Sequence, residues 1–117
     1  MLRFSIEVTR SAERDVDRII DSILRRFGEK YLAKWLASYE AAVLSLETLA
    51  DHCSLAREEE VLRVGLRRQL FGTRQNPYRV LFVVAEDEEE PMVRIVGVRH
   101  ARRRDYSEEE LRDALEE

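Results

Sequence analysis

The spacing of apolar residues changes near the middle of this 117-residue chain, and the change restricts the folds that it can adopt. Up to residue 50, apolar side chains recur every three or four positions, as they do on one face of an α-helix. From residue 64 onward they alternate with polar residues or form continuous runs, which is typical of β-strands. A helical half followed by a group of strands predicts an α+β fold. At this length we expect one domain that covers residues 1–117.

The first half of the chain predicts one strand and two helices. Residues 2–8 alternate loosely between apolar and polar side chains, so we expect a strand there. Thr9 or Ser11 can cap a helix over residues 12–27, and the glycine that follows is a typical stop. A second helix over residues 29–50 should form an antiparallel hairpin with the first, because the link between them is short. Three aromatic residues of the second helix are expected in the core: Tyr31, Trp35 and Tyr39.

The second half predicts three strands. Residues 51–60 are polar and irregular, and the apolar period then changes to two over residues 64–70. Residues 78–85 form a continuous β-branched and aromatic run, as expected of a strand that is buried on both faces. Residues 92–98 predict the next strand, and the acidic segment 86–91 predicts a hairpin loop between the two.

A short final helix is expected because Ser107 and Glu110 have the spacing of a capping box. The order is therefore one strand, a helical hairpin, three strands and a helix. We expect an α+β fold in which the helices pack on one face of an antiparallel sheet. Arg79 lies within the buried run, and an unpaired buried guanidinium is costly, so we expect it to pair with an acid.

The formal net charge of −4 hides a strong separation of charges along the chain. Five arginines and no acid lie between residues 62 and 83, and five more lie between residues 91 and 104. Acids are gathered elsewhere, as in residues 58–60 and 108–110. Basic groups at the rim of a small sheet are suited to holding a phosphodiester backbone or another polyanionic surface.

Few features of the sequence indicate a special compartment or cofactor. Cys53 is the only cysteine, so no intrachain disulfide can form and we expect a reducing cytoplasm. No apolar run reaches the roughly 20 residues of a membrane span, and the charged N-terminal segment does not predict a signal peptide. Cys53 and His52 with one more distant histidine do not make a metal site, and we expect neither a metal nor a cofactor.

Three segments together resemble the RelE/ParE superfamily, the toxins of type II toxin–antitoxin modules. They are the run Tyr78-Arg79-Val80-Leu81-Phe82, the basic segment Val98-Arg99-His100-Ala101-Arg102 and the preceding GLRRQLFG of residues 65–72. Each motif is degenerate, and the resemblance rests on their order and spacing over nearly the whole chain. It implies a growth-inhibiting toxin with a cognate antitoxin as its partner, and an acidic amphipathic segment would complement the arginines.

The superfamily has two branches with different activities. RelE-like members cleave mRNA in the ribosomal A site without a metal, and the resemblance would then make four residues catalytic: Arg74, Arg99, His100 and Tyr106. His100 can titrate near neutral pH and could act as acid or base. The lysines that RelE-like toxins carry in the first sheet hairpin are absent, however. Arg67 and Arg68 are the nearest basic residues, and arginine is a poor general base.

ParE-like members are described as poisons of DNA gyrase, and the sequence slightly favours this branch. The helix pair is long, and His100 lies in a basic segment followed by Asp105, as in ParE-like toxins. Under this interpretation His100 is a structural residue, bonded to a carbonyl or to a carboxylate such as Asp105. A third alternative is a non-catalytic RNA-binding or interaction module. The residues expected to bind a nucleic acid or another target are Arg67, Arg68, Arg102, Arg103 and Arg104.

Overall fold

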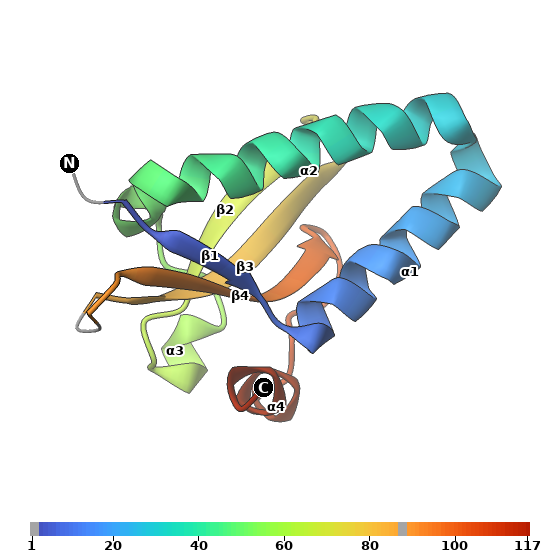
Figure 1. The fold of residues 1–117 in the computed structure, drawn as a ribbon. Helices are drawn as coiled ribbons and strands as arrows, with labels where there is room; N and C mark the ends of the chain where they lie inside the picture. The colour runs from blue at the N-terminus through green and yellow to red at the C-terminus, as the bar shows by residue number, and fades with distance from the viewer. Residues whose placement is uncertain (1–2, 87–88) are drawn as a thin grey trace.

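The computed structural model describes residues 3–86 and 89–117, and Figure 1 shows its fold. The first half contains β1 (Ser5–Val8), α1 (Arg10–Phe27), α2 (Glu29–Leu49) and the 3-10 helix η1 (Ala50–His52). The second half contains α3 (Glu59–Leu62), β2 (Arg67–Gly72), β3 (Pro77–Ala85), β4 (Met92–His100) and α4 (Glu108–Leu115). The predicted element order is therefore confirmed, with η1 and α3 added. The start of the predicted first strand, at Leu2, and part of the predicted hairpin loop, residues 87 and 88, lie outside the described residues.

The four strands form one mixed sheet in the order β1-β4-β3-β2. Strands β2, β3 and β4 are antiparallel neighbours, as predicted. Strand β1 pairs with β4 in parallel, from Ser5 beside Met92 to Val8 beside Ile95, so the sheet is not antiparallel throughout. An alternating pattern predicts a strand but gives neither its neighbour nor its direction. The long crossing through α1 and α2 allows this parallel pairing, because a parallel neighbour needs a long connection.

Helices cover both faces of the sheet, whereas the sequence predicted them on one face. In Figure 1 the α1–α2 hairpin lies above the sheet, and α3 and α4 lie below it. Val80 and Phe82 of β3 pack in the core beneath the hairpin, while Leu81 packs in a second core with Leu111 of α4. The second core exists because the central strands are apolar on both sides, as the continuous run at residues 78–85 indicated.

The N-terminal cap of α1 connects this helix to the sheet. The Thr9 side chain accepts a hydrogen bond from the backbone N–H of Ala12 at 3.2 Å and donates one to the carbonyl of Ile95 at 2.9 Å. One hydroxyl therefore caps the helix and fixes it to β4. At the other end, Gly28 has a φ of +87° at the bend between α1 and α2, a conformation that glycine adopts without strain.

The aromatic residues of α2 pack toward the sheet, as predicted. Trp35 is buried, and its ring lies 5.5 Å from those of both Phe71 and Tyr78, measured between ring centroids. Tyr31 and Tyr39 are partly buried against the same core. No helix in the described part of the chain is both long and apolar enough to cross a membrane.

Strand β2 begins at Arg67, three residues later than the sequence predicted. The residues before it are held by Glu59, whose carboxylate accepts backbone hydrogen bonds from Val64, Gly65 and Leu66 at 2.8–3.0 Å. Gly65 has a positive φ of +82°, so the chain turns here instead of extending. The apolar residues before Arg67 therefore do not form part of a strand. Leu66 is apolar because it is buried in the second core.

Candidate functional site

A buried ion pair lies under the start of β3. The Arg79 side chain is fully buried, and its Nη1 and Nη2 atoms lie 2.6 and 2.7 Å from the two carboxylate oxygens of Glu58. The backbone N–H of Tyr106 donates to the same carboxylate at 3.0 Å. Burial alone would raise the pKa of Glu58, but these hydrogen bonds outweigh it and the pKa lies below its ordinary value. The predicted acidic partner of Arg79 is thus confirmed as Glu58.

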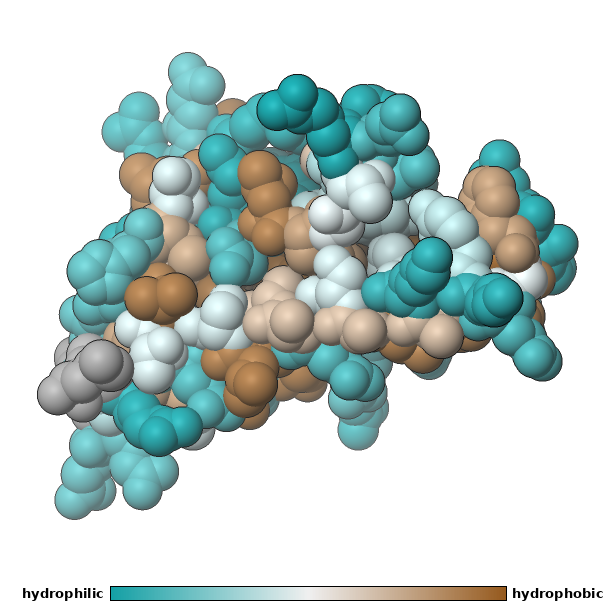
Figure 2. Space-filling model, turned by 90° about the horizontal axis from the view of Figure 1, so that it is seen from above, coloured by the Kyte–Doolittle hydropathy of each residue, from teal (hydrophilic) through white to brown (hydrophobic). Residues whose placement is uncertain are grey.

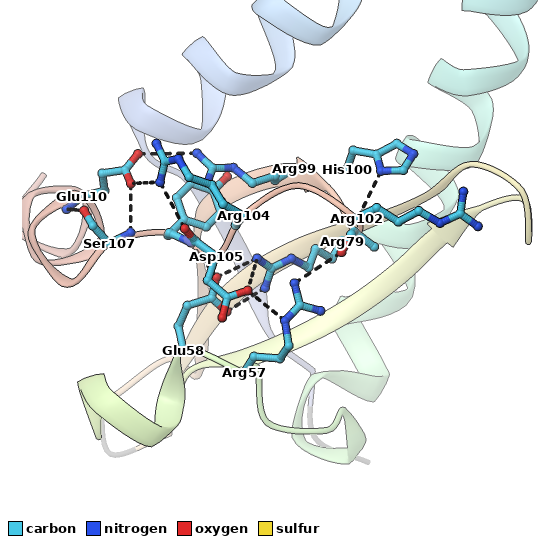
Figure 3. Close-up of polar contacts among 12 residues, drawn as sticks. Arg57, Glu58, Arg79, Arg99, His100, Arg102, Arg104, Asp105, Ser107 and Glu110 are labelled. Atoms are coloured by element: carbon cyan, nitrogen blue, oxygen red, sulfur yellow. Dashed lines mark hydrogen bonds and ion pairs between the residues drawn. The ribbon is translucent and has the colours of Figure 1, made fainter.

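A second acid extends this pair toward the surface (Figure 3). The Nε atom of Arg57 donates to Asp105 at 2.9 Å, and Asp105 also lies 3.8 Å from the Arg79 guanidinium. Arg57 further donates to the carbonyl of Ala101 at 3.3 Å. These contacts join the loop before α3 to the segment after β4. The suggested contact between Asp105 and His100 is wrong, because Asp105 lies with Arg79 beneath the sheet while His100 faces the hairpin side.

Arg99, near the end of β4, is enclosed by the C-terminal segment. It is only 6% exposed, and its guanidinium carbon lies 3.7 Å from the centre of the Tyr106 ring. It donates to the carbonyl of Arg104 at 3.0 Å, and its Nη2 atom lies 3.4 Å from the Glu110 carboxylate. Cation–π stacking, a carbonyl and a carboxylate therefore hold this guanidinium in place.

Tyr106 connects the second core to α1. Its hydroxyl donates to the Asp15 carboxylate at 2.6 Å, and the same Asp15 oxygen accepts the backbone N–H of Val98 at 3.1 Å. Burial first, and then the Asp15 charge, raise the pKa of Tyr106 far above its ordinary value. The hydroxyl is therefore a permanent donor in the folded protein. Its ring lies directly against Gly97, which leaves no room for a side chain.

His100 lies on the other side of the sheet, against the hairpin. Its ring lies 4.9 Å from that of Tyr78 in an edge-on arrangement, and its Nδ1 atom accepts the backbone N–H of Arg102 at 3.1 Å. Burial, and secondarily the charge of Arg102, lower the pKa of His100 below its ordinary value. Figure 3 shows the Arg99 and His100 side chains leaving β4 in opposite directions, as consecutive residues of a strand do.

The other predicted site residues lie in three places. Arg74 is exposed in the turn between β2 and β3, and its carbonyl accepts a hydrogen bond from Arg102 at 3.2 Å. Arg67 and Arg68 lie on β2, at the edge of the sheet farthest from β1. Arg103 and Arg104 are exposed just after β4, and Arg104 pairs with Glu110 at 2.9 Å.

A groove with a volume of about 460 Å³ lies between α1 and the end of β4. It brings together four of the predicted residues, namely Arg99, His100, Arg103 and Arg104. Arg67, Arg68, Arg74, Arg102 and Tyr106 are not part of its lining. Within residues 3–86 and 89–117, no group of three or more His, Cys, Asp or Glu side chains is arranged to hold a metal ion.

One wall of the groove comes from α1, and none of the residues of this wall is among the site residues predicted from the sequence. Arg18, Ser22 and Arg26 line it, together with the exposed ring of Phe27. The first three are spaced four residues apart, so they form one stripe along the helix. This spacing was visible in the sequence, but the strand edge that the stripe faces was not.

The fold is shared with a solved toxin–antitoxin structure. The structure described as the chromosomal ParDE TA system from P. aeruginosa matches this chain with a TM-score of 0.62 and 22% sequence identity, over 84% of this chain and 96% of that one. At this identity the match shows the fold alone, an α+β fold that the two chains share. A comparison with curated protein sequences gave no significant match.

The family of the chain is shown by its sequence. The profile of a family described as "ParE toxin of type II toxin-antitoxin system, parDE" matches residues 6–105. Since this match covers most of the chain, the protein belongs to the ParE toxin family. The matched range begins within β1, continues through the helical hairpin and includes the strands β2, β3 and β4.

Proposed function

We propose that this chain arrests growth by inhibiting DNA gyrase and that a cognate antitoxin neutralises it. Membership of the ParE toxin family supports the proposal, because the match extends from β1 to beyond β4. The RelE-like alternative needs a base, an acid and cations gathered around one phosphate. The observation that carries our preference is that only Arg99 and His100, of the four residues suggested for RNA cleavage, line one groove, and their side chains leave β4 in opposite directions.

Arg99 and Tyr106 stack on each other beneath the sheet, and His100 faces the opposite side. Arg74 lies in a separate turn. Tyr106 is poorly suited to act as an acid, because its buried hydroxyl already donates to Asp15 and its raised pKa makes it a weaker proton donor. These positions suit structural roles better than the roles of a nuclease.

The antitoxin part of the proposal is supported by the charge of the C-terminal half. Arg103 is exposed and has no carboxylate partner among the described residues, and it lies at the groove beside α1. An acidic segment of an antitoxin would neutralise this surface. The test is co-expression with a small acidic protein encoded beside this chain. Failure of that protein to co-purify or to restore growth would contradict the antitoxin proposal.

The target is tested by controlled induction in a bacterial host and with the purified protein. We expect growth arrest with filamentation and gyrase-linked DNA breaks, and inhibition of supercoiling of a relaxed plasmid by purified gyrase. A variant with Arg112→Gln, on the exposed face of α4, serves as the control and should retain both effects.

Two other outcomes would decide against gyrase. Arrest with new 5′ ends on translated messages and unchanged DNA would identify a ribosome-dependent nuclease, and Arg74→Ala with Arg99→Ala should then abolish cleavage. No arrest at all would leave the third alternative, a basic binding module.

A further inference from the structure

We infer that the groove between α1 and β4 binds a short single-stranded segment of nucleic acid, with phosphates on its arginines and a base on Phe27. This inference goes beyond the proposed function and does not depend on gyrase being the target. It rests on three observations: the positive charge of the groove, an exposed aromatic ring held in a fixed position, and an edge of β4 at which a backbone N–H is already hydrogen-bonded to a side chain.

The groove has an excess of positive charge. Five arginines line it, and Arg18, Arg99 and Arg104 have carboxylate partners in Asp15 or Glu110. Arg26 and Arg103, both exposed, have no carboxylate partner within the described ranges 3–86 and 89–117. Against these five cations the lining contributes only those two acids, so the groove has a net charge of +3 when His100 is neutral. Guanidinium groups in such a groove match phosphate oxygens in geometry and charge.

An aromatic ring is held at the rim of this basic groove. Phe27 is 56% exposed although its ring stacks on Tyr31 with centroids 4.9 Å apart, and the Arg26 guanidinium lies 5.4 Å from the ring centre. Hydrophobic surface is surrounded by hydrophilic side chains at the hairpin end of the molecule, on the right of Figure 2. Aromatic rings beside cations are the usual platform for unpaired bases, because every base can stack regardless of its sequence.

The edge of β4 in this groove is not open to an added peptide strand. In the part of the chain that the structure describes, β4 has no neighbouring strand on the β1 side beyond Ile95. The backbone N–H of Val98 there donates to Asp15 at 3.1 Å. A peptide that paired with this edge would have to displace the Asp15 carboxylate. Recognition by arginines and an aromatic ring, rather than by backbone pairing, therefore fits the groove, and its volume of about 460 Å³ suits one or two nucleotides better than a duplex.

The experiment measures, by fluorescence anisotropy at several salt concentrations, the affinity of the purified full chain for labelled oligonucleotides. The probes are 12-nucleotide single strands of dT and rU and a DNA duplex of the same length. We expect each of Arg26→Gln and Arg103→Gln to weaken single-strand binding about tenfold and to reduce the slope of log K against log salt by roughly 0.7 per lost phosphate contact. Phe27→Leu should weaken it about fivefold or more without changing the slope. Arg3→Gln removes one exposed charge far from the groove and is the matched control.

Three results would overturn the inference. The first is that Arg26→Gln and Arg103→Gln behave like Arg3→Gln, or that no single strand binds. The second is that the duplex binds more tightly than the single strands and that Phe27→Leu does not change the affinity for the duplex. The third is that an oligoglutamate peptide binds more tightly than dT and loses the same factor in Arg26→Gln, which would assign the groove to an acidic segment of the antitoxin instead of a nucleic acid. Circular dichroism of each variant excludes misfolding, and gyrase inhibition is scored separately so that either proposal can fail alone.

Discussion

At the scale of single residues, the most constrained position is Arg79. Its guanidinium is fully buried, and both of its Nη atoms donate hydrogen bonds to the Glu58 carboxylate. Burial of a charge pair gains little net stability over a pair of apolar residues, but loss of one partner leaves the other charge buried alone. Single substitutions at this pair should therefore have much larger effects than substitutions at the exposed ion pairs.

We predict that Glu58→Gln lowers the free energy of unfolding by about 3–5 kcal/mol, because Arg79 then loses its buried carboxylate partner and keeps only the half-exposed Asp105 at 3.8 Å. Urea denaturation followed by circular dichroism measures this change. Glu60→Gln is the control: this exposed residue lies two positions further along, in α3, and its substitution should shift the free energy by less than about 0.5 kcal/mol. Equal effects of the two substitutions would show that the buried pair is not important for stability.

Gly97 is constrained by the Tyr106 side chain that packs against it. A Cβ atom at this position would lie 2.7 Å from the Tyr106 hydroxyl oxygen and 2.8 Å from the adjacent ring carbon. We predict that Gly97→Ala destabilises the protein by about 1–3 kcal/mol through overpacking against Tyr106. In a Tyr106→Ala background the same substitution should cost much less. A double-mutant cycle of unfolding free energies tests this, and simple additivity of the two substitutions would contradict it.

At the scale of elements, α4 shows how a local motif can have distant consequences. The Ser107 side chain accepts from the backbone N–H of Glu110 at 3.1 Å, and the Glu110 side chain accepts from the backbone N–H of Ser107 at 2.9 Å. The Glu110 carboxylate also pairs with Arg104 and Arg99. The capping box of α4 thus fixes the acid that holds Arg99 in place.

Ser107→Ala removes one half of this capping box. We predict a loss of about 1 kcal/mol in the free energy of unfolding, the usual effect of an N-cap deletion. Hydrogen exchange at the amides of residues 108–111 should also become faster. Glu116→Gln, exposed after the last turn, is the control, and unchanged exchange in Ser107→Ala would show that the box is not needed.

Local patterns in the sequence were sufficient for most elements. The helix caps at Thr9 and Ser107 and the buried run of β3 depend on neighbours within a few residues, so their signals are visible in the sequence. The parallel pairing of β1 and the α1 wall of the groove depend on contacts between distant residues. The Glu58 partner of Arg79 was equally hidden, because the acidic run that contains it gives no sign that one of its members is buried.

At the scale of the whole molecule, several carboxylates have lowered pKa values in the folded state. The hydrogen bond from Arg104 and the backbone N–H of Ser107 lower the pKa of Glu110 to about 2. The pKa of Glu58 is also lowered, since its hydrogen bonds outweigh the effect of burial. Carboxylates of this kind stabilise the fold when they are ionised, and this contribution is lost when they are protonated.

The sign of the pH dependence follows from these values. An unfolded glutamate titrates near roughly 4.3, so the contribution is complete above that pH and is lost as the pH falls toward the folded pKa, about 2 for Glu110. We predict that the free energy of unfolding is nearly constant from pH 7 to 5 and falls steeply below 4, as urea denaturation at each pH can show. Glu110→Gln should flatten this fall and Glu109→Gln should not. An unchanged pH profile in Glu110→Gln would contradict the assignment.

The parallel pairing of β1 with β4 also affects how the protein is made. Ser5 leaves the ribosome long before its partner Met92, and at about 5–20 residues per second the first strand waits several seconds for its neighbour. The helical hairpin has local contacts and can form during that interval. Because β4 lies between β1 and β3, the sheet and the groove beside it cannot be completed until β4 has been translated. A nascent or truncated chain that lacks β4 therefore lacks this surface, and any toxicity that depends on it begins only after β4 has been synthesised.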